Sequence, residues 1–169
     1  MAIRYEGKLY RALNPIFAHE PLSGQGAALY GGRFNPKGVP TLYASLSVMT
    51  ALREANQVGS LQPTTLVSYD AEIASIFDCR DEGALAAQGM TADMLAAATW
   101  RDEARATGEA KTQGFARRLM QAGHHGLLVR SFAPGSKVED LNLVLWTWGD
   151  AEPARLVLID DERRLSRPT

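Results

Sequence analysis

The order of strand-like and helix-like segments is what most constrains the fold of this chain. Runs that favour β-strands stand near both ends, whereas residues 81–123 are rich in Ala, Gln, Met and charged side chains and are expected to be helical. Strands alternating with helices would predict parallel βαβ units, but strands grouped before and after a helical stretch predict an α+β fold. We therefore expect mixed or antiparallel sheets with helices, and no doubly wound nucleotide-binding fold.

Six runs are expected to form strands, because they are rich in apolar or β-branched residues and end near turn residues. They cover 7–13, 40–45, 64–73, 126–131, 141–148 and 155–160. A helix is expected over 48–58, with Ser47 as its N-cap and Gly59 as its stop. Two or three shorter helices are expected within 81–123. Their candidate caps are Thr91 and Thr112.

Length, charge and cysteine content indicate how many domains to expect and which kinds of partner are disfavoured. The 169 residues suffice to bury about 70% of the unfolded surface, so we expect one domain over 1–169, with its core from about 7 to about 160 and a polar tail at 163–169. The 18 basic and 19 acidic residues give a net charge of -1 and no broad basic face, so no direct nucleic-acid binding is expected. The sequence has a single cysteine, no apolar core of a leader at its start and no long apolar run. We therefore expect a cytoplasmic protein without membrane contact.

The segment Gly31-Gly32-Arg33-Phe34-Asn35-Pro36-Lys37-Gly38 is the densest group of special residues, and an expected loop over 20–26 leads towards it. The glycine pair permits backbone paths that side chains forbid, and Asn-Pro-Lys-Gly suits a type I turn. The guanidinium of Arg33 suits a phosphate or carboxylate held in one orientation. Two interpretations stay open: an anion grip, or a hairpin connection whose arginine pairs with an acid.

Four other polar residues are candidates for a site. Glu54 has apolar helical neighbours, which predicts a partly buried carboxylate. Tyr43 points away from Leu42 on its strand, and either packs in the core or faces a ligand. Ser131 and Asn142 lie in apolar strands, where each needs a ligand or a buried partner.

Metal and nucleophile chemistry are not indicated. His124 and His125 have no further ligand at metal-binding spacing, so no metal site is expected. Cys79 lacks an identifiable base, and there is no nucleophile elbow. His19 lies in a polar loop, and its role as a surface residue or a proton carrier stays open.

Together these segments resemble the RES domain, a family named for its Arg, Glu and Ser. The resemblance spans about residues 7–160, and Phe34 stands where many members carry Trp. It is carried by Tyr10-Arg11, Pro21-Leu22-Ser23-Gly24, Gly26-Ala27, Gly31 to Gly38, Leu42-Tyr43, Ala51-Leu52, Glu54 and Arg130-Ser131.

The resemblance implies a toxin of a bacterial type II toxin–antitoxin system of the RES–Xre type, with a fold similar to ADP-ribosyltransferase toxins and NAD as substrate. The chain looks most like the ParT-like branch, which transfers ADP-ribose to a protein, with phosphoribosyl pyrophosphate synthetase as the implied target. The implied partner is an antitoxin with an Xre-like helix-turn-helix domain that covers the active site.

The resemblance also implies roles for the candidate residues. Glu54 would stabilise the oxocarbenium-like ribose that forms when the nicotinamide bond breaks, and Tyr43 would stack on nicotinamide. Arg33, with Arg11, would bind the phosphates or ribose. Hydrogen bonds to the ligand or to these groups would come from Ser131 and Asn142.

Other functions remain open at the level of sequence. Water or phosphate as the acceptor would make the protein an NAD glycohydrolase or an NAD phosphorylase. A ribonuclease toxin that uses His19 is a second class, which the near-neutral charge disfavours. A non-catalytic anion-binding module around Arg33 is a third.

Overall fold

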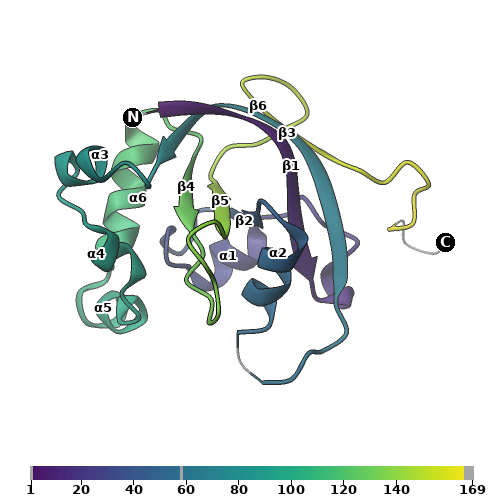
Figure 1. Cartoon of the computed structure of the whole chain (residues 1–169), viewed down its shortest axis with the longest axis horizontal. Coiled ribbons are helices and arrows are strands. Elements are labelled where there is room, and N and C mark those ends of the chain that lie inside the picture. The colour runs from purple at the N-terminus through teal and green to yellow at the C-terminus, as the bar shows by residue number, and fades with distance from the viewer. Residues whose placement is uncertain (1, 58, 166–169) are drawn as a thin grey trace.

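A strongly curved six-stranded sheet forms the centre of the protein (Figure 1). The computed structural model describes residues 2–57 and 59–165, so the end of the expected helix at 58 and the tail at 166–169 lie outside the described residues. The strands are β1 Ala2–Leu13, β2 Leu42–Ser45, β3 Thr65–Asp78, β4 Gly126–Arg130, β5 Leu141–Leu145 and β6 Ala154–Leu158.

The strand pairings close a ring. The sheet order is β1-β2-β5-β4-β3-β6, and β1 also pairs with β3, so the first five strands of that order return to their start. β1 and β3 lie side by side from Ala2–Phe77 to Leu13–Thr65 and arch over the shorter strands (Figure 1). Only the β3–β4 pair is parallel among the strands of the described residues. The expected α+β fold with mixed strands is confirmed.

The helices divide into two groups. α1 Gln25–Tyr30 and α2 Val48–Ala55 flank β2, while the other four gather at one side of the sheet (Figure 1). These four are α3 Glu82–Ala87, α4 Ala92–Ala96, α5 Trp100–Thr107 and α6 Lys111–Gln121. In the part of the chain that the structure describes, no helix combines the length and apolar character needed to cross a bilayer.

The alternation of side chains along the strands builds two apolar clusters. Leu42 and Ala44 join one cluster with residues of β1 and β3, whereas Tyr43 packs against a second cluster. That second cluster joins the sheet to α3, α4 and α6, through side chains such as Phe77 and Phe115. As expected, Tyr43 therefore points away from Leu42 and towards the helical side of the sheet.

Several of the boundaries that the sequence predicted for helices were wrong. The expected loop runs into helix α1, which begins at Gln25, and α2 ends at Ala55 because the Asn56 side chain caps the Leu52 carbonyl. Residues 81–123 hold four helices, and Thr112 lies buried inside α6 instead of capping it. Thr91 and Ser47 do cap their helices, as expected.

Distant partners decide where two strands end. β3 continues past Ile73 to Asp78, because Ile76 to Asp78 pair with β4. β5 stops at Leu145, because the Trp146 amide turns to the His125 carbonyl. The strand expected over 141–148 therefore ends at Leu145.

Candidate active site

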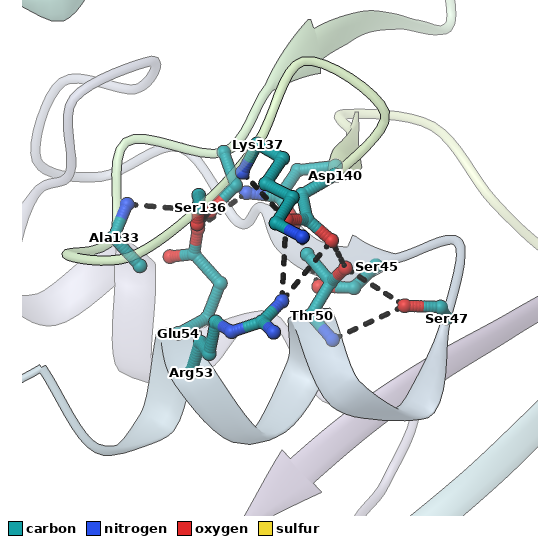
Figure 2. Close-up of polar contacts among 11 residues, drawn as sticks. Ser45, Ser47, Thr50, Arg53, Glu54, Ala133, Ser136, Lys137 and Asp140 are labelled. Carbon is teal, nitrogen blue, oxygen red and sulfur yellow. Dashed lines mark hydrogen bonds and ion pairs between the residues drawn. The ribbon is translucent and has the colours of Figure 1, made fainter.

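Glu54 is the centre of a polar cluster built from three elements (Figure 2). α2 carries this carboxylate, and Ser131 directly after β4 donates a hydrogen bond to its Oε1 atom. Asn142 Nδ2 on β5 donates to the same oxygen at 2.6 Å, and Gln57 Nε2 donates to Oε2 at 3.0 Å. The structure thus brings together three of the residues singled out in the sequence, and it satisfies the carboxylate with neutral donors.

Further hydrogen bonds fix the two donors of Glu54. Ser45 Oγ donates to Asn142 Oδ1 at 2.7 Å, which orients the amide so that its nitrogen faces the carboxylate. Ser136 Oγ donates to Ser131 Oγ at 2.9 Å, and that oxygen also accepts from the Ala133 amide at 3.2 Å. Glu54 is therefore held in one orientation by a chain of directed bonds.

The loop that carries Ser131 is clamped to α2 through Asp140 (Figure 2). The Asp140 carboxylate accepts from Thr50 Oγ1 at 2.9 Å and from Arg53 Nη1 at 3.2 Å. The Lys137 amide also donates to it at 2.7 Å. These donors, the backbone amide first, lower the pKa of Asp140. The sequence analysis missed this clamp, because its members lie about 90 residues apart along the chain.

Arg33 lies over the cleft beside Glu54 and is anchored by backbone carbonyls. Its Nη1 donates to Leu95 at 2.9 Å and to Ala97 at 2.7 Å, and its guanidinium carbon lies 4.8 Å from the Phe132 ring centroid. Burial first, and then the charge of Arg101, lower the pKa of Arg33. The Gly32–Asn35 bridge closes a tight turn, but the Gly31–Gly38 segment links α1 to β2, so it is not a hairpin connection between two strands. Arg33 donates to backbone carbonyls instead of to an acid.

Tyr43 holds the arginine segment with its hydroxyl. The hydroxyl donates to Asn35 Oδ1 at 2.6 Å and accepts from the Phe34 amide at 3.1 Å. Burial raises the pKa of Tyr43, so the phenol stays protonated. A Cβ at Gly32 would lie 2.5 Å from both the Tyr43 hydroxyl and Asn35 Oδ1, so only glycine fits there. The hydroxyl is thus fully engaged in the fold, and the ring is the part of Tyr43 that a ligand can meet.

Two buried amides complete the support of this segment. Asn35 Nδ2 donates to the Ala27 carbonyl at 2.9 Å, and Gln113 Nε2 donates to the carbonyls of Gly32 and Asn35 at 3.0 and 3.1 Å. Trp146 Nε1 donates to the Phe34 carbonyl at 2.9 Å. The sequence analysis noted Asn35 only as a turn residue and missed Gln113, whose position on α6 gives no local signal.

The site opens to solvent through two adjoining hollows. The Glu54 cleft has a volume of about 270 Å³, and Arg33, Tyr43, Asn142 and Arg101 are among its lining residues. The Arg11 hollow, of about 240 Å³, shares Tyr43 and Glu54 with it. Arg11 itself donates to the Pro21 carbonyl at 3.0 Å. Arg101 was not among the residues singled out in the sequence, although its charge acts on Arg33.

The remaining candidates lie apart from these hollows. Ser131 lines neither of them, and its hydroxyl contacts Glu54 instead. His19 lies near Glu20, with Nε2 3.6 Å from the carboxylate, and lines neither hollow. His124 and His125 contact Ser75. Within residues 2–57 and 59–165, no group of three or more His, Cys, Asp or Glu residues could hold a metal ion.

Comparisons with known proteins agree with this architecture. The sequence pattern of the RES domain matches residues 8–167. The chain belongs to the RES domain family. Among solved structures, this RES domain is similar to a chain in the crystal structure of the MbcT–MbcA toxin–antitoxin complex of M. tuberculosis. The two share 22% identity and a TM-score of 0.66, over 94% of this chain and 84% of the other. No curated protein matches the sequence.

Proposed function

We propose that the protein is the toxin of a RES–Xre type toxin–antitoxin system, which cleaves the nicotinamide–ribose bond of NAD and transfers ADP-ribose to a protein. One observation carries the proposal: the Glu54 carboxylate is held by Ser131 and Asn142 beside a cleft that Arg33 and Arg101 also line. Family membership and the likeness to a chain of a toxin–antitoxin complex support it.

Glu54 supplies the charge that this reaction needs. As nicotinamide leaves, positive charge develops on the ribose ring, and a fixed carboxylate beside that ring stabilises the transition state. The bonds from Ser131 and Asn142 orient the carboxylate before the substrate arrives, so little reorganisation is required during the reaction. One Glu54 oxygen accepts both bonds, which leaves the other, shared with Gln57, to face the ribose hydroxyls.

Two arginines favour an anionic ligand in the cleft. Burial first, and then the charge of Arg101, lower the pKa of Arg33, and an anion between the two arginines would remove their repulsion. A pyrophosphate fits this requirement, because a guanidinium donates several parallel hydrogen bonds to phosphate oxygens. Arg11 contributes a further cation on the far side of Tyr43.

Tyr43 and its neighbours suit the nicotinamide ring. The Tyr43 ring, Phe34, Phe132 and Val144 give the cleft apolar walls. The nicotinamide ring stacks on such surfaces. Because nicotinamide leaves as a neutral molecule, the apolar walls do not hold it back by charge. The engaged hydroxyl of Tyr43 keeps the stacking ring at a fixed angle.

The partners follow from the proposed class. The toxin belongs to the ParT-like branch, acts in the cytoplasm and modifies phosphoribosyl pyrophosphate synthetase. Its cognate antitoxin carries an Xre-like helix-turn-helix domain and covers the hollows around Glu54, which would prevent NAD from entering.

Incubation of the purified protein with NAD labelled in its adenylate phosphate tests this function and its acceptor. With lysate present, a labelled protein band supports transfer, free ADP-ribose indicates a glycohydrolase, and a phosphate adduct formed with added phosphate indicates a phosphorylase. RNA cleavage without NAD loss would instead indicate a ribonuclease, and NAD binding without nicotinamide release would leave only an anion-binding module.

Glu54→Gln is the decisive variant for the assay. Glutamine keeps an oxygen for Ser131 and Asn142 but removes the charge, so nicotinamide release should fall by ~100-fold while the fold persists. Glu139→Gln, an exposed change in the nearby loop, is the matched control and should retain activity. Full activity of a folded Glu54→Gln protein would contradict the role of Glu54.

A further inference from the structure

A basic groove adjoins the Glu54 cleft, between the 30–37 segment and helix α5. Its volume is about 590 Å³, more than twice that of the Glu54 cleft at about 270 Å³. Trp100 and Arg101 line both hollows, so a single extended ligand can reach from Glu54 into the groove.

A dinucleotide is too large for the Glu54 cleft alone. Pockets for small molecules measure about 300–1,000 Å³, so the cleft has room for a nicotinamide ribose and not for a second nucleoside. The Arg11 hollow adds only about 240 Å³, and the cation there is turned to the Pro21 carbonyl. The basic groove is the larger and more cationic extension of the site, and Tyr30, 80% exposed, offers it a ring on which adenine can stack.

The groove carries more positive charge than NAD requires. Lys37, Arg101 and Arg105 line it, and none of its described lining residues is acidic. Arg101 stacks on Trp100, 4.5 Å from the ring centroid, and lies with Arg33 where the pyrophosphate passes. Lys37 and Arg105 then have no anion of NAD to bind. Among the described residues, Arg105 forms an ion pair only with Asp102, at 3.9 Å, and both side chains are about four-fifths exposed.

Dinucleotide sites distinguish their ligands at the adenosine ribose. A carboxylate that binds the 2′-hydroxyl selects NAD, whereas a nearby arginine accommodates the 2′-phosphate of NADP. We propose that this groove binds the adenosine end of the dinucleotide through Lys37 and Arg105, and that the protein takes NADP as a substrate as well as NAD. This inference rests on the proposed cleavage of the nicotinamide–ribose bond.

The bond changes are the same with either dinucleotide. The bond from the ribose carbon to the nicotinamide nitrogen breaks, and its electron pair leaves with neutral nicotinamide. The acceptor oxygen or nitrogen forms a bond to that carbon and loses its proton to solvent. The 2′-phosphate stays on the product, so the extra cations act on binding alone.

The test compares kcat/KM for NADP and for NAD, measured as nicotinamide release. We expect the unmodified protein to use NADP at least as well as NAD. In the Lys37→Glu/Arg105→Glu variant, the NADP/NAD ratio should fall by about tenfold or more, because charged hydrogen bonds to the 2′-phosphate are lost. A folding defect lowers both activities together, so it does not move this ratio.

Lys8→Glu/Arg164→Glu is the matched control, since it reverses two exposed charges outside both hollows and the groove. It should leave the ratio unchanged. Cleavage of NAD without cleavage of NADP would overturn the inference and leave the proposed function standing, as would an unchanged ratio in the groove variant. No cleavage of either dinucleotide would overturn both.

Discussion

At the scale of single residues, the arginine segment depends on close approach of backbone to side chain. Gly32 lets the Tyr43 hydroxyl and Asn35 Oδ1 come within 2.5 Å of the position that a Cβ would occupy. Both oxygens belong to the bonds that fix the loop directly after Arg33 and the Tyr43 ring beside Glu54. The geometry of the cleft therefore requires a residue without a Cβ at position 32.

Gly32→Ala is expected to displace Tyr43 and to lower both stability and NAD cleavage. Overpacking of this kind costs about 1–3 kcal/mol, which thermal unfolding detects. Gly26→Ala is the control, because a Cβ there meets nothing within 4 Å and the residue lies in helix α1. The control should be neutral or gain up to about 1 kcal/mol. Equal melting temperatures for the two variants would contradict the close-approach argument.

At the scale of elements, helix α2 joins two tasks. Glu54 lines the cleft, while Thr50 and Arg53 bind Asp140 of the loop after β4. That loop supplies Ser131, so the clamp keeps the hydrogen-bond donor against the carboxylate (Figure 2). The helix and the loop therefore act as one unit in the site.

Asp140→Asn should weaken this unit in a pH-dependent way. Because the folded pKa of Asp140 lies below its ordinary value of 3.8, the stability it contributes is present above that value and is lost as pH falls through the lowered pKa. The difference in melting temperature between the variant and the unmodified protein should thus be largest near pH 7 and shrink below about pH 4.

Asp150→Asn, an exposed change, is the comparison and should show no such trend. A melting-temperature difference for Asp140→Asn that persists unchanged at the lowest pH would contradict the ionised clamp. NAD cleavage measured beside the melting curves shows whether the loosened loop also lowers activity.

At the scale of the whole molecule, closure of the sheet by β1 and β3 separates two apolar clusters. The second cluster joins the sheet to α3, α4 and α6 and includes Cys79, which is only 7% exposed. Burial raises the pKa of this thiol, so it is neither accessible nor ionised in the folded state.

Cys79 is therefore expected to report on opening of the helical layer. In folded protein at about pH 8, the thiol should not react with a disulfide reagent on the timescale on which an exposed thiol reacts. In denaturant it should react fully, and the rate at intermediate denaturant concentrations should follow the opening of α3, α4 and α6. Rapid stoichiometric labelling of the folded protein would contradict the packing of this layer.

Local patterns account for much of the fold. Alternation in residues 42–45 placed Tyr43 on the face opposite Leu42, and the Ser47 cap set the start of α2. These features depend on neighbouring residues alone, which is why they are legible in the sequence. The end of β3 was missed because it depends on pairing with β4, some 50 residues later.

The sequence by itself determined the order of strands and helices, the α+β class and the residue types from which a cleft of this chemistry is assembled. Only the tertiary structure decided that Glu54 receives hydrogen bonds from Ser131 and Asn142, and that Gln113 supports the Arg33 segment. It also decided that Arg101 lines both the Glu54 cleft and the basic groove beside that cleft. The reason is physical: periodicity and caps act over a few residues, whereas these contacts form only when closure of the sheet brings distant segments together.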